Sequence, residues 1–140
     1  MKSTILASLL LGTLLTGAAF AQSAAPIKLA DVAELSGGGA TVGTNWKNGI
    51  DLAVEEINAK GGILGHKLEV THADSQSNPG VARAQVQKSL DSEPYVLLAP
   101  GHSGSVKVTA PLAAEAAISH IMGGAAAKLP LAGNPLLFAS

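Results

Sequence analysis

The sequence predicts an α/β protein built on a parallel β-sheet. Three observations lead to this prediction. Short apolar or alternating segments recur at residues 27–33, 67–73, 95–99, 118–122 and 136–139, helix-compatible segments separate the first four, and glycine or polar turns join the two kinds. Strands that alternate with helices imply parallel strands and right-handed crossovers. In such sheets ligands bind beyond the carboxyl ends of the strands.

Composition limits the protein to one modest domain and excludes several functions. The chain has 140 residues, 47 % of them hydrophobic, which allows a packed core. Nine basic side chains nearly balance ten acidic ones and aromatics make up 3 %, so we expect no nucleic-acid partner. Cysteine is absent, which excludes disulfides, cysteine-ligated zinc and a thiol nucleophile.

The N-terminus predicts export. Lys2 is a short positive region, residues 5–15 are mostly apolar, and Ala19-Phe20-Ala21 is a small-x-small cleavage site. We interpret residues 1–21 as a secretory signal peptide and residues 22–140 as the mature domain. The alternative, an uncleaved membrane anchor, requires a longer apolar run of about 20 residues.

The first half of the chain contains the clearest helix. The strand at residues 27–33 leads into ELSGGGATVG, residues 34–43, which we interpret as a glycine-rich loop. A helix is predicted over residues 44–60, because Ile50, Ala53, Val54 and Ile57 share one helical face. Gly61-Gly62 is a suitable helix stop.

The second half continues the alternation. A strand at 67–73, a polar loop at 74–78 and a helix beginning at Pro79 precede the strand YVLLA. Helix 104–117, strand 118–122, a loop and strand 136–139 complete the order. Three small-residue loops, at 34–43, 100–104 and 123–128, therefore lie at the carboxyl ends of strands, where a ligand can approach backbone N–H groups.

The glycine-rich loop does not match nucleotide-binding motifs. A dinucleotide fingerprint, G-x-G-x-x-G, fits Gly37 and Gly39 but has Val42 at the third glycine position. A phosphate loop fits Gly38 and Gly43 but has Thr44 in place of lysine. We therefore set nucleotide binding aside.

Ser103 follows a buried strand in the sequence PGHSGS. It resembles the nucleophile of a G-x-S-x-G elbow, but Ser105 replaces the last glycine, and Glu115 and His120 are the only downstream partners for a triad. A second interpretation is that Ser103 caps the following helix. The third is that its hydroxyl and the helix N-terminal N–H groups cradle a carboxylate or another anion.

The other polar candidates are weaker. The four histidines share no metal-ligand spacing, so we expect scattered surface or edge residues, with only His102 where a ligand would bind. Asp74 ends a strand at the ligand side, where a carboxylate commonly caps a helix or meets water. Trp46 lies early in a helix and is expected to pack rather than stack on a ligand.

The segment NGIDLAVEEINAKGGILGHKLEV, with ELSGGGATVG before it and LLAPGHSGSVKVTAPLAAEAAI and GNPLLF after it, resembles the periplasmic leucine/isoleucine/valine-binding protein family of ABC importers. The resemblance covers residues 27–138. It implies a three-layer parallel sheet with helices on both faces, the incomplete N-terminal lobe of a two-lobed type I periplasmic-binding fold. It also implies capture of a small polar ligand, such as a branched-chain amino acid, for delivery to a membrane permease, with no catalysis and no cofactor.

The resemblance carries site residues over only in part. The family's ligand-binding serine falls on Ser103 and a backbone contact falls on Gly124. A hydroxyl residue falls on Ala126 and an aromatic cover falls on Val42, so those two contacts are lost. These departures suit a related ligand, such as an aliphatic amide or an organic acid, or a decayed site.

Family members are more than twice as long and have a second lobe that supplies groups for the ligand's ammonium. Since this sequence stops at Ser140, we expect a fragment of the first lobe. A sensor or receptor lobe of the same fold is the alternative to an importer component, and a secreted serine hydrolase is a third possibility.

Overall fold

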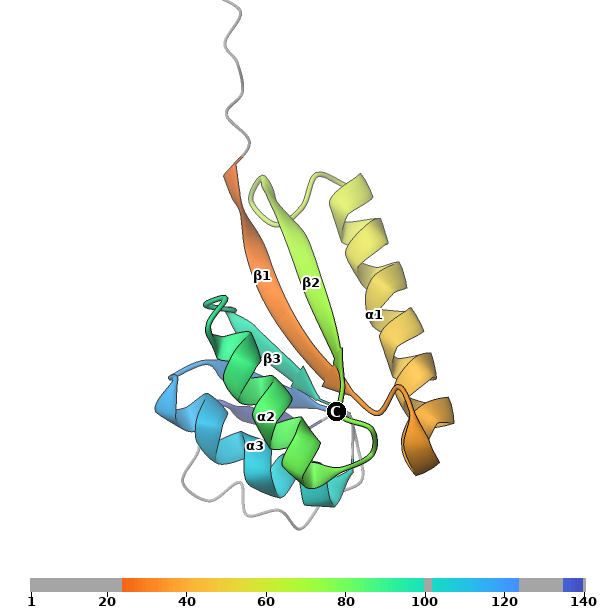
Figure 1. Ribbon diagram of the computed structural model, residues 1–140. Coiled ribbons are helices and arrows are strands. Elements are labelled where there is room, and N and C mark those ends of the chain that lie inside the picture. The colour runs from red at the N-terminus through yellow and green to blue at the C-terminus, as the bar shows by residue number, and fades with distance from the viewer. Residues whose placement is uncertain (1–23, 100–101, 124–134, 140) are drawn as a thin grey trace, which may run out of the picture.

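A five-stranded parallel sheet forms the centre of the molecule. The structure, a computed structural model, describes residues 24–99, 102–123 and 135–139. The strand order is β2-β1-β3-β4-β5, and every pair is parallel, as predicted (Figure 1). The strands are β1 (Ala24–Ala33), β2 (His66–Asp74), β3 (Val96–Ala99), β4 (Ser119–Met122) and β5 (Leu137–Ala139).

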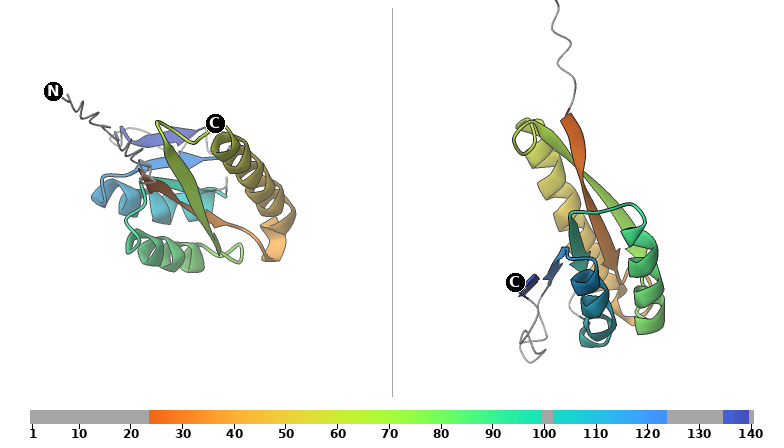
Figure 2. Two further views of the ribbon diagram at one scale, coloured as in Figure 1. Left: turned by 90° about the horizontal axis from the view of Figure 1, so that it is seen from above. Right: turned by 90° about the vertical axis from the view of Figure 1, so that its left-hand side faces the viewer.

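Helices cover both faces of this sheet. Helix α1 (Ala40–Ala59) contacts β1 and β2 on one face, while α2 (Pro79–Leu90) and α3 (Ser103–Glu115) pack together on the other (Figure 2). The predicted three-layer α/β class is therefore confirmed. Among the described residues, no helix is long and apolar enough to cross a membrane.

The main core lies between the sheet and the α2–α3 layer. Side chains alternate along β1, so Ala30 and Val32 face these helices and Asp31 faces α1. The members of the core cluster are each less than a twentieth exposed: Ala30, Val32, Ala82, Val86, Leu97, Leu112 and Ala113. A smaller cluster of Val106, Met122 and Leu137 extends it under β4 and β5.

The predicted loop at residues 34–43 is wrong in its second half. A short 3₁₀ turn, η1 (Gly37–Gly39), leads directly into α1, which begins at Ala40 rather than at residue 44. The glycines that suggested a loop instead allow close packing. A β-carbon at Gly43 would fall 2.1 Å from the carbonyl oxygen of Glu34, so only glycine lets the first turns of α1 lie against the end of β1.

The remaining boundaries agree with the predictions within a few residues. Helix α2 spans the predicted range and begins with a side-chain cap, because Asn78 Oδ1 accepts from the N–H groups of Gly80 and Val81. Pro79 occupies the first helical turn, as expected. The proposed signal peptide, residues 1–21, lies outside the described residues.

Candidate functional site

The carboxyl ends of the strands lie along one edge of the sheet. There β1 leads into η1 and α1, β2 leads into α2, β3 leads toward α3, and β4 ends at Met122, which Gly123 follows (Figure 1). This edge, called the ligand edge below, is where a doubly wound parallel sheet binds its ligands.

Ser103 is exposed at the ligand edge as the first residue of α3. The N-cap residue is His102, which is also exposed and makes no side-chain capping hydrogen bond. The interpretation of Ser103 as the helix cap is therefore wrong, because its neighbour takes that position. The Ser103 hydroxyl is therefore left at the surface of the ligand edge, at the start of a 13-residue helix.

Of the other residues carried over by resemblance, the structure describes Val42 but not Gly124 or Ala126. Val42 lies in the first turn of α1 and is 65 % exposed, so it belongs to a helix and not to the predicted loop. Gly124 and Ala126 lie outside the described residues. The described part of the chain therefore places Ser103 and His102 at the start of α3, and Val42 at the start of α1.

The predicted triad partners do not serve Ser103. His120 is fully buried on β4, and neither ring nitrogen has a hydrogen-bond partner among the described residues. Its imidazole is therefore not bonded to the Ser103 hydroxyl. Burial lowers the pKa of His120 to about 4, so this histidine is neutral at pH 7.

Asp74 organises the connection after β1. Its Oδ1 accepts from the N–H groups of Leu35, Ser36 and Gln76 at 2.9, 3.1 and 2.8 Å, and its Oδ2 accepts from Ser36 Oγ at 2.6 Å. Burial alone would raise the pKa of Asp74, but these hydrogen bonds together lower it. The carboxylate at the end of β2 thus clamps a neighbouring connection rather than capping a helix.

Glu34, at the end of β1, is buried to 2 % exposure. Its Oε1 has no hydrogen-bond partner among the described residues. Burial raises the pKa of Glu34, while its own backbone N–H and the nearby His102 lower it. A buried carboxyl group therefore lies at the ligand edge, close enough to the N-cap of α3 to interact with it electrostatically.

A second group of polar residues joins β1, β2 and α1. Asp31 is fully buried, and its Oδ2 lies 2.6 Å from His72 Nδ1 while its Oδ1 accepts from Trp46 Nε1 at 3.0 Å. His72 Nε2 lies 2.8 Å from Asp51 Oδ1. Lys47 in turn pairs with Asp51 Oδ2 at 2.5 Å.

Sequence reasoning missed this group. The four histidines were expected to be scattered surface or edge residues, but His120 is buried and His72 bridges two carboxylates. One signal was available, since Asp31 interrupts an otherwise apolar buried strand. Trp46 packs, as expected, because its ring lies against the backbone of Gly123. Within residues 24–99, 102–123 and 135–139, no group of three or more acidic or histidine side chains is arranged to hold a metal ion.

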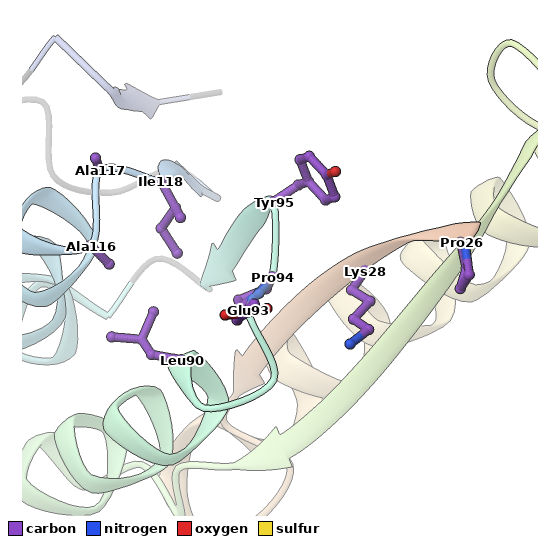
Figure 3. A pocket seen from close by; sticks show the side chains of 9 residues that line it. All are labelled: Pro26, Lys28, Leu90, Glu93, Pro94, Tyr95, Ala116, Ala117 and Ile118. Carbon is purple, nitrogen blue, oxygen red and sulfur yellow. The ribbon is translucent and has the colours of Figure 1, made fainter. Parts of the chain in front are cut away.

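One hollow of the described residues lies away from the ligand edge. A cavity of about 560 Å³ lies at the opposite, amino-terminal ends of the strands (Figure 3). Tyr95 and Lys28 border this cavity, and Lys28 Nζ donates to the carbonyl oxygen of Ser92 at 3.1 Å. Because ligands of such sheets bind at the other edge, this cavity is not the candidate site.

Comparison with known proteins agrees with this geometry. The profile described as periplasmic binding protein matches residues 26–139. The chain belongs to the periplasmic binding protein family. A Leu/Ile/Val-binding protein, BraC3 from Rhizobium johnstonii, is 38 % identical over 96 residues, which cover 68 % of this chain and 26 % of the relative.

Solved structures of the family have the same fold. The substrate-binding protein LivJ of the branched-chain amino acid transporter from Streptococcus pneumoniae, in complex with isoleucine, superposes with a TM-score of 0.78 and 31 % identity. A putative branched-chain amino acid ABC transporter protein from Silicibacter pomeroyi gives a TM-score of 0.62 and 30 % identity. These alignments cover 81 % and 69 % of this chain, but 33 % and 25 % of the solved chains.

This chain therefore spans about a quarter to a third of the length of the three relatives named here. The family profile matches all or part of each strand of the sheet. The activity, substrate and partners of the whole relatives are matters for proposal.

Proposed function

We propose that this chain carries part of the ligand-binding first lobe of an ABC importer's substrate-binding component. In this role it captures a branched-chain amino acid, or a related small polar molecule, in the periplasm after the signal peptide is removed. It delivers that ligand to a membrane permease and catalyses no reaction. The observation that carries the proposal is the exposed Ser103 hydroxyl at the start of α3, on the ligand edge of a chain of this family.

The chemistry of this position suits a carboxylate. The first turn of an α-helix presents N–H groups without intrahelical partners, and the helix dipole favours negative charge there. The Ser103 hydroxyl adds one donor beside them. In this proposal the backbone at Gly124 supplies a further contact.

The relatives support an amino acid as the ligand class. The curated relative is named a Leu/Ile/Val-binding protein, and the solved neighbour from Streptococcus pneumoniae was determined with isoleucine. Val42 and Ala126 stand where the family has an aromatic cover and a hydroxyl donor, so the proposal includes relatives of these amino acids, such as aliphatic amides and organic acids.

Calorimetric titration of the protein with L-isoleucine, L-leucine and L-valine tests this function. A hydrogen bond to a charged group contributes about 1.5–3 kcal/mol, so Ser103→Ala should weaken binding by about ten- to hundredfold. Ser92→Ala is the matched control, because Ser92 lies beyond α2 at the opposite edge of the sheet and its Oγ donates to the carbonyl oxygen of Ser89.

Two results would contradict the proposal in different ways. Unchanged affinity in Ser103→Ala would remove Ser103 from the site. Absence of binding to all three amino acids would show that the ligand class is wrong, and titration with an aliphatic amide and a short organic acid would then test the related classes.

A further inference from the structure

We propose that Asp31, His72 and Asp51 share one proton and use it to hold Trp46 as a positioning residue against Gly123 at the ligand edge. This arrangement makes ligand affinity depend on pH, a consequence that rests on the proposed function. Three sets of contacts support this proposal. They join side chains from β1, β2 and α1, and the last of them reaches Gly123, which follows β4.

The first set of contacts requires an extra proton. His72 Nδ1 lies 2.6 Å from Asp31 Oδ2, and His72 Nε2 lies 2.8 Å from Asp51 Oδ1. An ionised carboxylate only accepts hydrogen bonds, and a neutral imidazole has a single N–H. Both short contacts therefore need either an imidazolium ring or a protonated carboxyl group. Without that proton, a ring lone pair would face a carboxylate oxygen.

The other titratable groups near these three residues come from the end of β1 and from β2, α1 and α2. Glu34, which follows β1, is close enough to Asp31 for the two carboxyl groups to interact electrostatically. Asp31 comes from β1 and has no solvent exposure, and Asp51 and Lys47 come from α1, where Lys47 pairs with Asp51 at 2.5 Å. Asp74 lies two residues after His72 on β2, and its carboxylate accepts hydrogen bonds from the N–H groups of Leu35 and Gln76. Lys88 of α2 lines a hollow on the other face of the sheet. His72 also borders this hollow, although its ring nitrogens contact Asp31 and Asp51.

The second set of contacts connects the shared proton to Trp46. Asp31 accepts from Trp46 Nε1 at 3.0 Å with the carboxylate oxygen that does not face His72. The same buried carboxylate therefore orients the imidazole on β2 and the indole on α1. Burial raises the pKa of Asp31, and the hydrogen bonds from His72 and Trp46 oppose this effect. Loss of either hydrogen bond therefore makes Asp31 harder to ionise, which weakens the other hydrogen bond.

The third contact connects Trp46 to the ligand edge. A β-carbon at Gly123 would fall 2.5 Å from Cζ3 of Trp46, so the indole ring lies directly on the glycine backbone. The Gly123 N–H donates to the carbonyl oxygen of Ala99 at 3.0 Å, which joins the ends of β3 and β4. The indole thus packs against the end of β4 at the ligand edge.

Loss of the shared proton should loosen this support. The buried Asp31 carboxylate would then face an imidazole lone pair, or His72 would break its contact with Asp51, and in both cases the bond to Trp46 is strained. We expect the indole to move from Gly123 as pH rises, and ligand affinity to fall with it by about three- to tenfold.

Trp46 fluorescence provides the test, because it is the only tryptophan in the chain. Emission of the protein should be recorded from about pH 5 to about pH 9, the range in which a histidine proton is exchanged. We expect a change in emission maximum and intensity in the wild type and in the control His66→Gln, which removes another histidine from β2. The change should be absent in His72→Gln.

A second variant keeps the test valid if His72→Gln does not fold. Asn at position 51 can donate an N–H to His72 Nε2 and still accept from Lys47, so Asp51→Asn makes the contacts possible with a neutral imidazole. Asp51 is partly exposed, which favours an intact fold. This variant should keep the low-pH emission of the wild type up to about pH 9.

The fluorescence result decides the inference independently of the proposed function. An emission profile that is flat in the wild type, or equally pH-dependent in His72→Gln and Asp51→Asn, would overturn it. Calorimetry with L-isoleucine at the two ends of the same pH range then tests the coupling. Affinity that falls with pH in the wild type but not in Asp51→Asn supports it, and parallel profiles overturn it. Absence of isoleucine binding at every pH contradicts the proposed function, not the positioning of Trp46.

Discussion

At the residue scale, the main feature is a pair of buried acidic side chains. Asp31 lies in strand β1 and Glu34 directly after it, where burial would suit apolar side chains. Asp31 has two partners in the described structure, whereas Glu34 Oε1 has none there. The two acids therefore differ in degree, since the contacts of Asp31 offset part of the cost of its burial, whereas Glu34 Oε1 has no such partner among the described residues.

Glu34→Gln should stabilise the fold at neutral pH. Burial raises the pKa of Glu34 from its ordinary 4.5, so the folded state binds this proton more strongly than the unfolded state. Stability then falls as pH rises from about 4.5 through the raised pKa, and the loss is complete above it. Removing the charge should therefore raise the free energy of unfolding at pH 7.

Urea denaturation at pH 7 and at pH 4 checks this expectation. The gain should be present at pH 7 and small at pH 4, where the wild-type carboxyl group is protonated. Glu69→Gln is the control, because Glu69 is exposed on β2 and its replacement should leave the free energy of unfolding unchanged at both pH values. A loss of stability in Glu34→Gln at pH 7 would mean that the folded protein holds Glu34 ionised and well solvated.

At the scale of elements, the start of α1 depends on how closely it approaches β1. Gly43 and Gly49 both lie inside α1, but their surroundings differ. A β-carbon at Gly43 meets the Glu34 carbonyl oxygen at 2.1 Å, whereas one at Gly49 meets nothing within 4 Å. The same substitution should therefore have opposite effects at the two positions.

Gly49→Ala should stabilise the protein by about 1 kcal/mol, because alanine is the better helix former. Gly43→Ala gains the same propensity but forces α1 away from β1, and overpacking of this kind costs about 1–3 kcal/mol. Thermal denaturation of both variants gives the comparison directly. Stabilisation by Gly43→Ala would show that α1 can shift away from β1 at little cost.

These element boundaries show what the sequence predicts well. Periodicity and Pro79 placed α2 within its observed range, and the alternation of strands and helices predicted the parallel sheet. The start of α1 was mistaken because GGGATVG has the composition of a loop, while the structure uses Gly43 for close packing. Local composition does not reveal a contact with residue 34, which depends on tertiary structure.

The same limit applies to the candidate site. Ser103 was found because a hydroxyl residue follows a buried strand and precedes a helix, which is a local pattern. The Asp31–His72–Asp51 group was missed because its members are separated by about 20 and 41 positions and meet only when β2 and α1 pack on β1. Long-range polar contacts of this kind have no spacing rule.

At the scale of the whole molecule, buried titratable groups act on stability in opposite directions. Glu34 and Asp31 have raised pKa values, so their effect lowers stability as pH rises from acid. His120 acts in the other direction. Burial lowers its pKa from 6.5 to about 4, so the unfolded state binds more protons than the folded state between these values. The stability associated with neutral His120 is complete above about pH 6.5 and is lost as pH falls to about 4.

Replacing His120 should therefore change the pH profile of the whole protein. The shift of about 2.5 pKa units corresponds to roughly 3 kcal/mol between pH 6.5 and pH 4. His120→Leu removes this dependence and two buried nitrogens without partners among the described residues, so it should raise stability at pH 7 and more strongly at pH 4.5. The profile that remains should rise less steeply with pH, because His120 no longer opposes Glu34 and Asp31, whose pKa values are raised. Urea denaturation across this range, with His66→Gln as control, measures both slopes, and an unchanged acid slope in His120→Leu would show that His120 is hydrated in the folded protein.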